Sequence, residues 1–302
     1  MRVTNPYKLL FPADGITKGA VVAHYQALGS AMVEFVAGRP LTLQRFPRGI
    51  GSKGFMQKNA ADHFPPSIRR LPVPKRGGGE TVYPVVDQAD DLAYLANQNT
   101  ITFHMWTSSA DHPGRPDWLV MDLDPEAGDT DSARAATLTI RRVLETFGLR
   151  GQPVATGSKG FHVWVPLRSD GGETDGFGAV ALASRALAGL AVAAEPDRLT
   201  TEFLKRNRKG RVFVDWLRNG PTATVVVPFS LRPRAGAPVA TPLTWDEVPT
   251  TDPDHWRLDT IGERPSIQWP EPQDLPVADI EEAARAAGVD LDTPHDRFGR
   301  DR

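Results

Sequence analysis

The chain has 302 residues, 40% hydrophobic and 24% charged, which is the composition of an ordinary soluble globular protein that can bury a sizeable core. It contains no cysteine, so disulfides, thiolate metal sites and thiol catalysis are excluded, and any metal must bind oxygen or imidazole. We expect no apolar run long enough to span a bilayer, no signal peptide, and therefore a cytoplasmic protein without a membrane partner.

The net charge of −2 hides an uneven distribution of charge along the chain. Residues 246–302 hold fifteen Asp/Glu against six Arg, so the preceding residues carry about +7. Residues 35–61 contain five Lys/Arg and no acid, and residues 198–218 contain seven Lys/Arg against two acids. Either segment alone is equally consistent with a solvated surface. Together, interleaved with phenylalanines, they favour a polyanionic partner.

The predicted helices and strands mix without strict alternation, which indicates an α+β fold. In chain order, the first prediction is a helix that Thr17 caps and that runs to about Phe35. Residues 65–80 are expected to be a Pro/Gly-rich surface connection, and residues 210–232 a hairpin around an Asn-Gly turn. The other predicted strands cover residues 41–46, 81–87, 100–106 and 118–124 and a hairpin at 153–167; the other helices cover 90–98, 130–147, 177–193 and 277–287.

Two carboxylates end a predicted buried strand in RPDWLVMDLDP, residues 115–125. Residues two apart on a strand point to the same face, so Asp122 and Asp124 project together while Leu123 points the other way. Carboxylates this close repel each other unless a cation lies between them, and a hard divalent ion is the natural candidate. In the alternative interpretation, one acid simply caps the following helix. The Asp-x-Asp pattern alone leaves both open.

Asp215 ends a second apolar strand, VFVDW. It would supply the third acid that a site for two ions and a triphosphate requires, unless it is a buried acid paired with an arginine. Both interpretations stay open without further context.

The turn TGSKG, residues 156–160, offers that context. Its glycines allow close approach of a ligand, and its amides can form an anion-binding nest with the Lys159 charge and the Thr156 and Ser158 hydroxyls. His162 follows on the next strand, either as a ligand or as a core histidine. The turn is not a P-loop, so ATPase chemistry is not indicated.

Taken in order, seven motifs resemble the polymerase domain of bacterial ligase D, within the archaeo-eukaryotic primase superfamily. The resemblance covers roughly residues 3–235, and the combination is more specific than any one motif. The motifs are NPYKLLFP (5–12), RFP with GFMQK (45–58), ITFH (101–104), RPDWLVMDLDP (115–125), TGSKGFH (156–162), KRNRKGRVFVDWLRN (205–219) and PFSLR (228–232).

The resemblance implies a primase-polymerase core over residues 1–240, with central mixed or antiparallel sheets flanked by helices. A Pro-rich acidic extension, residues 241–302, would pack on this domain or trail from it. The catalytic residues would be Asp122, Asp124 and Asp215, holding two Mg²⁺ or Mn²⁺ ions. The incoming NTP or dNTP, with ribonucleotides preferred, would be bound by His104, Thr156, Ser158, Lys159, His162, Arg208, Arg218, Ser230 and Arg232. Arg45, Phe55 and Lys58 would contact the template, and Lys8 and Lys18 would bind a downstream 5′-phosphate.

The function implied is a template-dependent polymerase that fills short gaps or extends broken double-stranded DNA in repair. Because no Lys-x-Asp-Gly ligase motif is present, we expect a stand-alone, monomeric, nucleoid-associated relative that works with Ku and a separate DNA ligase. One alternative is primase activity. Another is a metal-dependent nuclease, which has no use for a triphosphate cradle. The third is a non-catalytic DNA-end binder, which would leave the three acids without a purpose.

Overall fold

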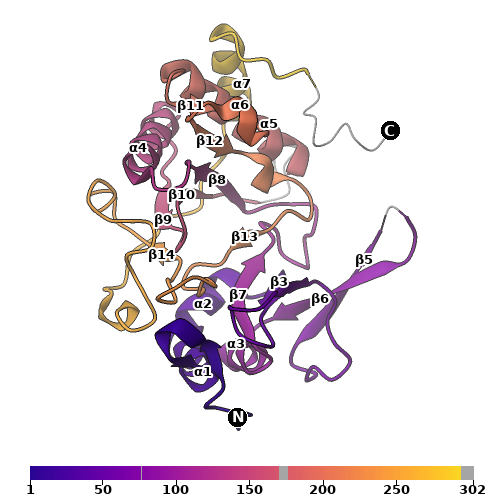
Figure 1. The fold of residues 1–302 in the computed structure, drawn as a ribbon. Coiled ribbons are helices and arrows are strands. Elements are labelled where there is room, and N and C mark those ends of the chain that lie inside the picture. Colours follow the sequence, from indigo (N-terminus) through magenta and orange to yellow (C-terminus); the bar gives the residue numbers. More distant parts are fainter. Residues whose placement is uncertain (76, 170–175, 294–302) are drawn as a thin grey trace.

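Two sheets, one in each lobe of the molecule, organise the chain (Figure 1). The structure is a computed structural model that describes residues 1–75, 77–169 and 176–293. The strands of the first sheet are β3 (Arg39–Arg45), β4 (Phe55–Gln57), β5 (Arg69–Pro74), β6 (Glu80–Val86), β7 (Thr100–Met105) and β13 (Val225–Val226). They lie in the order β13-β7-β3-β6-β5, with β4 paired to β3.

The second sheet has the order β11-β12-β8-β10-β9-β14. Its strands are β8 (Trp118–Asp124), β9 (Gln152–Ala155), β10 (Phe161–Pro166), β11 (Leu199–Thr200), β12 (Val212–Asp215) and β14 (Thr241–Pro242). Only β11 and β12 pair in parallel; the other strand pairs within both sheets are antiparallel. The mixture of helices with mainly antiparallel sheets confirms the expected α+β class.

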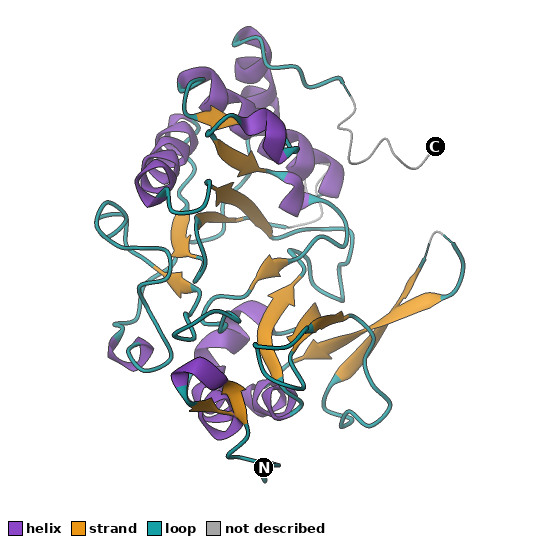
Figure 2. Cartoon of the chain, viewed as in Figure 1, coloured by secondary structure: helices purple, strands orange, loops and turns teal. Residues whose placement is uncertain are grey.

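Helices cover each sheet (Figure 2). The first lobe contains α1 (Lys18–Ala27), α2 (Gly29–Val36), α3 (Ala89–Asn97) and a small sheet of β1 (Leu9–Phe11) and β2 (Ile16–Thr17). The second lobe contains α4 (Thr130–Thr146), α5 (Phe177–Ala194), α6 (Lys205–Arg208) and α7 (Val277–Ala286). Short 3-10 turns are η1 (Pro12–Asp14), η3 (Leu217–Asn219) and η4 (Ile261–Glu263).

The first predicted helix is correct at its start and wrong in its length. The Thr17 hydroxyl accepts the backbone N–H of Ala20 at 3.2 Å, as expected of an N-cap. The helix then divides between α1 and α2. At the break, Gly29 packs so tightly on α3 that a Cβ there would lie 2.8 Å from the Cβ of Ala89. Hydrophobic spacing alone does not reveal such a close contact.

The surface connection predicted for residues 65–80 and the hairpin predicted for residues 210–232 are also wrong. Residues 69–74 form β5, which pairs with β6 over six residue pairs in an arm that projects from the first lobe (Figure 1). Its prolines are tolerated because β5 is an edge strand. The expected hairpin after residue 210 does not form, since β12 belongs to the second sheet and β13 to the first. Asn219 instead bonds both the N–H and the C=O of Val120, at 2.7 and 2.8 Å.

Helix α5 corrects the expectation that no apolar run could span a bilayer. By length and composition alone its 18 residues could do so. In the structure it is a core helix, because Val180, Ala183 and Leu187 are buried among residues of β8, β10 and α4. We therefore interpret its apolar character as packing.

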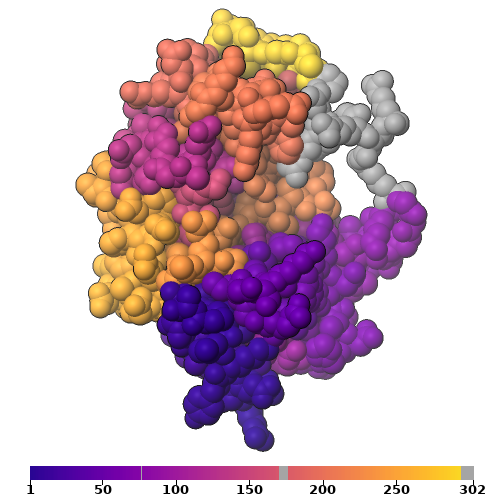
Figure 3. Space-filling model, viewed as in Figure 1, coloured from indigo at the N-terminus to yellow at the C-terminus, as the bar shows by residue number. Residues whose placement is uncertain are grey.

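The stretch after residue 240 runs, in its orange part, along one side of the molecule and, in its yellow part, over the far end of the second lobe (Figure 3). Thr241 and Pro242 extend the second sheet, and α7 packs on α5. Trp269 lies with its ring centroid 4.9 Å from that of Phe35 in α2 and 5.6 Å from that of Trp118 in β8. This stretch therefore supplies packing between the lobes. Its last residues, 294–302, lie outside the described part of the chain.

Candidate active site

A row of titratable side chains crosses three neighbouring strands of the second sheet. Asp215 on β12 is the register partner of Asp122 on β8, and Asp122 is the partner of His162 on β10. Directly opposite residues of antiparallel strands share a face, so all three point the same way. Val120 and Trp164, on this same face, pack in the core shared with the first lobe, whereas Leu123 lies in the core beneath α4 and α5. The row thus faces the first lobe.

Each carboxylate already has a positively charged partner. Arg218 Nε lies 3.0 Å from Asp122 and 3.2 Å from Asp215. Asp124, which shares the face of Asp122, contacts Lys159 at 3.1 Å and Arg208 at 3.4 Å. The sequence predicted that the acids lie together, and the structure shows that basic residues of two separate motifs, Lys159 of one and Arg208 and Arg218 of the other, converge on them.

The pKa values follow from this arrangement. Burial disfavours the charged form of Asp122, but His162 and Arg218 outweigh burial and hold the pKa of Asp122 well below its ordinary value. Burial likewise acts against the charge of Arg218, and Asp122 and Asp215 outweigh it and raise the pKa of Arg218. The site therefore favours negative charge on Asp122 and positive charge beside it.

The TGSKG turn lies against the end of β8. A Cβ at Gly160 would lie 1.8 Å from the carbonyl oxygen of Leu123, so only glycine fits there. Gly157 has a φ of +66°, and a Cβ on it would lie 2.7 Å from Cγ of Arg232. Thr156 Oγ1 donates to the Gly160 carbonyl at 2.7 Å. The glycines thus bring the turn beside Asp124 and Arg232.

Arg232 completes a cationic wall next to this turn, and His104 lies beside it. Arg232 Nη1 donates to the Thr156 carbonyl at 2.8 Å. Burial lowers the pKa of Arg232 to about 10, which keeps it charged at neutral pH. Burial, together with Arg232, Arg218 and His162, lowers the pKa of His104 to about 3, so its imidazole is neutral. The predicted phosphate ligands from both lobes therefore lie close enough to influence one another.

Two more residues belong to this wall: Arg234, which the sequence did not identify, and Ser230, which it did. Arg234 donates Nη1 to Ser158 Oγ at 3.3 Å, and its position two residues after Arg232 was the signal that could have identified it. Ser230 has no exposed surface, and its Oγ accepts the Phe103 N–H at 2.8 Å. The Ser230 hydroxyl therefore supports the segment that carries Arg232.

The three predicted template residues lie in the first lobe, on and just after the β3–β4 pair. Arg45 and Phe55 are register partners, with the guanidinium 5.6 Å from the ring centroid. Phe55 remains 47% exposed, which is unusual for a large aromatic side chain, and Lys58 is exposed just beyond β4. This exposed aromatic ring with two cations forms a second group, which has no ion pair with the carboxylates.

The lysine pair Lys8 and Lys18 lies in the small β1–β2 region. The Lys18 N–H donates to the Lys8 carbonyl at 2.7 Å. The Lys18 side chain is only 3% exposed, and its Nζ donates to Thr4 Oγ1 at 2.7 Å. Burial and the neighbouring Lys8 lower the pKa of Lys18. Neither lysine contacts an acidic side chain of the described ranges, so within those ranges the two cations have only uncharged partners.

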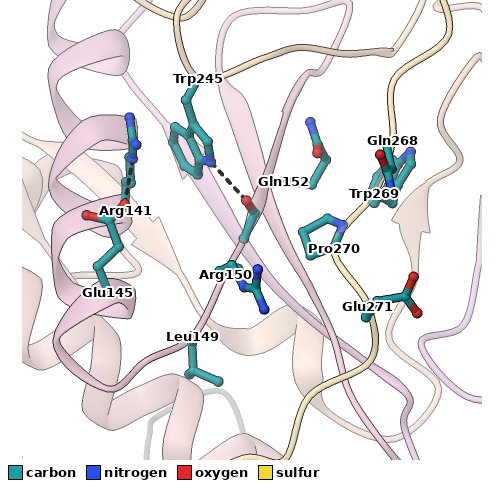
Figure 4. Close-up of a pocket in the computed structure, with 11 residues that line it drawn as sticks. Arg141, Glu145, Leu149, Arg150, Gln152, Trp245, Gln268, Trp269, Pro270 and Glu271 are labelled. Carbon is teal, nitrogen blue, oxygen red and sulfur yellow. Dashed lines mark hydrogen bonds and ion pairs between the residues drawn. The ribbon is translucent and has the colours of Figure 1, made fainter.

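A cavity of about 470 Å³ opens elsewhere, at the start of β9 (Figure 4). Trp245 lines it, donates its indole N–H to the Gly151 carbonyl at 3.0 Å and lies under the Arg141 guanidinium. None of the predicted site residues borders this cavity. This cavity is therefore separate from the carboxylate cluster.

The donor set suits divalent ions. Three carboxylates supply the hard oxygen ligands that Mg²⁺ and Mn²⁺ prefer, and in this structure arginine and lysine side chains neutralise them. Over the described ranges, no three His, Asp or Glu are spaced as a finished metal site. The carboxylates would therefore have to exchange arginine and lysine partners for ions.

Comparisons with known proteins agree with this geometry. The "Multifunctional non-homologous end joining protein LigD" of Mycolicibacterium smegmatis is 34% identical over 286 residues, 92% of this chain and 37% of that protein. The "Bifunctional non-homologous end joining protein LigD" of Bacillus subtilis is 28% identical, over 93% of this chain and 46% of that protein. The chain thus spans less than half the length of these relatives.

A solved structure matches the fold as well. The "Polymerase Domain from Mycobacterium tuberculosis Ligase D in complex with DNA" superposes with a TM-score of 0.76 at 29% identity, covering 97% of this chain and 99% of that one. The family model described as "LigD, primase-polymerase domain" matches residues 17–268. This confirms the resemblance expected from the motifs and, with it, the expected enzyme class. The chain belongs to the LigD primase-polymerase family.

Proposed function

We propose that this protein is a template-dependent nucleotidyltransferase that fills short gaps or extends DNA ends during repair. One observation carries the proposal: three carboxylates on one face lie beside a wall of cations from the TGSKG turn, α6 and the PFSLR segment. A nuclease would need the acids but not the wall. A DNA-end binder would need the cations, but the acids would repel its phosphates.

Asp122, Asp124 and Asp215 would hold two Mg²⁺ or Mn²⁺ ions, which when bound neutralise the triphosphate and activate the primer 3′-hydroxyl. Lys159 and Arg208 would then be released from Asp124 to bind phosphate oxygens. Arg232 would bind bidentately as a buried guanidinium, and neutral His104 would donate a hydrogen bond. His162 and Arg218 would orient Asp122. The TGSKG amides, with Thr156 and Ser158, would form the floor of the phosphate site.

Two further groups would place the DNA. Phe55 would stack on a template base while Arg45 and Lys58 neutralise the template backbone. Lys8 and Lys18 would bind the 5′-phosphate on the far side of a gap, because they carry positive charge without an acid beside them. The same proposal includes a preference for ribonucleotides, a role with Ku and a separate ligase in end joining, and action on nucleoid DNA in the cytoplasm.

The decisive experiment is extension of a labelled primer across a one-nucleotide gap with a downstream 5′-phosphate. It uses Mn²⁺ and each nucleotide in turn against the four template bases. We expect the primer to gain one nucleotide, chosen by the template base. Shortening of the primer would establish a nuclease instead, and tight binding with an unchanged primer would establish an end binder.

A further inference from the structure

The segment Pro228–Arg232 is held in an unusual conformation by groups outside the nucleotide site. Phe229 has a φ of +67°, which non-glycine residues rarely adopt. Its N–H donates to the Ala240 carbonyl at 2.6 Å, and its carbonyl accepts Nε2–H of His24 at 2.9 Å. The strained backbone therefore depends on its neighbours to aim Arg232, three residues later.

Tyr25 of α1 is the centre of that support. It is fully buried, and its hydroxyl donates to the Ile101 carbonyl of β7 while accepting the Leu231 N–H at 2.9 Å. The Ser230 hydroxyl lies 3.4 Å from the same oxygen. A single phenol group therefore joins β7 to the segment that bears Arg232.

The two elements joined by Tyr25 both carry proposed nucleotide ligands. β7 presents His104, and the segment presents Arg232. A second bond ties them, since Thr102 Oγ1 of β7 donates to the Leu231 carbonyl at 2.7 Å. Because Arg232 also donates to the Thr156 carbonyl, a shift of the segment would move the cationic wall and the phosphate turn together.

We propose that Tyr25 is a positioning residue for the nucleotide site, fixing Arg232 against His104 from within the core. The proposal rests on the function proposed above. Loss of the hydroxyl leaves the Leu231 N–H and the Ile101 carbonyl without their partner in the core, while the ring still fills its place. The segment then relaxes, Arg232 is displaced, and ground-state binding of the triphosphate weakens. The metal-binding carboxylates, on the other sheet, are untouched.

The test is Tyr25→Phe in the gap-extension assay with GTP opposite a template C and Mn²⁺. We expect the KM for GTP to rise about 3- to 10-fold, as for loss of a buried hydrogen bond, with kcat and the Kd for gapped DNA within about twofold. Excess GTP should restore the rate. Tyr94→Phe is the matched control, because Tyr94 also donates to a backbone carbonyl in the first lobe, that of His63 at 3.1 Å.

Thr102→Val removes the second bond to Leu231 and should raise the KM in the same way, which keeps the proposal testable if Tyr25→Phe folds poorly. An unchanged GTP KM in both variants, with melting temperatures lowered as in Tyr94→Phe, would show that Tyr25 only stabilises the core. Calorimetric titration of GTP separates the two proposals. If wild type binds GTP without extending a primer, the polymerase proposal fails, while a weaker Kd in Tyr25→Phe still supports the positioning role.

Discussion

Two charged regions of this protein are built in opposite ways. On the second sheet, Asp122, Asp124 and Asp215 are each within 3.4 Å of an arginine or lysine. In the first lobe, Lys8 and Lys18 meet no acid in the described part of the chain, and Lys18 is buried nonetheless. One region is neutralised by the protein itself, and the other is left with positive charge.

The difference shows what each region is prepared to bind. A self-neutralised cluster can exchange its internal cations for metal ions, and the released arginine and lysine then become available to a triphosphate. A buried charge without a counterion is costly for a fold, and the anionic ligand proposed above would repay that cost on binding. Under the proposed function, the first region would serve chemistry and the second recognition.

The largest effect should come from the neutralised cluster. Asp122→Asn keeps the shape of the side chain but removes a charge that His162 and Arg218 favour. We expect primer extension to fall by at least about 1000-fold, because metal-assisted charge stabilisation is lost. Single-turnover gap filling with Mn²⁺ measures this. Asp274→Asn, an exposed acid paired with Arg168, serves as control, and equal losses in the two variants would contradict the assignment.

The next effect should come from the lysine pair. Lys8→Ala with Lys18→Ala removes two cations from the expected phosphate site, so binding to a 5′-phosphorylated gap should weaken about 10- to 100-fold. Binding to an open primer-template should stay unchanged. Fluorescence anisotropy on matched DNAs with and without the phosphate measures the difference. A loss of the same size on both DNAs would show that the lysines bind DNA without recognising its end.

Stability should change in opposite directions in the two regions. Lys18→Met removes an unpaired buried charge and should raise the free energy of unfolding by about 1 kcal/mol. Asp122→Asn leaves Arg218 one partner short and should lower it by about 1 to 3 kcal/mol. Urea unfolding measures both, with exposed Lys58→Met as the control for a lysine change. A destabilised Lys18→Met protein would mean that the lysine is needed for the fold.

The sequence predicted the acids better than their surroundings. The shared face of Asp122 and Asp124 could be predicted because strand periodicity is a local property of the sequence. The apolar run in VFVDW likewise predicted that Asp215 ends a strand. The register that places Asp215 opposite Asp122 is a long-range pairing that no local pattern encodes. The same limit applies to the missed break at Leu28, beside which Gly29 makes a close long-range contact with Ala89.

Tyr25 and Asn219 illustrate a second limit. Tyr25 lies within the first predicted helix, where nothing in the sequence marks its role, and its bonds to Ile101 and Leu231 join three segments that are distant in the sequence. Asn219 in an Asn-Gly pair is typical of a hairpin turn, but its side chain instead takes the place of a strand partner beside Val120. A side chain that hydrogen-bonds to the backbone of a distant segment can be identified only once the fold has brought the two segments together.

The smallest effect concerns pH and follows from the uncompensated lysine. Burial and Lys8 lower the folded-state pKa of Lys18, so the unfolded chain, with a lysine pKa of about 10.4, holds that proton more tightly. The loss of folding stability caused by burying the charged Lys18 is therefore complete below the folded-state pKa. It disappears as the pH rises toward the unfolded-state pKa. The stability advantage of Lys18→Met over wild type should shrink between neutral pH and about pH 10.4. Urea unfolding at several pH values checks this, and an advantage that stays constant would show that Lys18 bears no burial penalty.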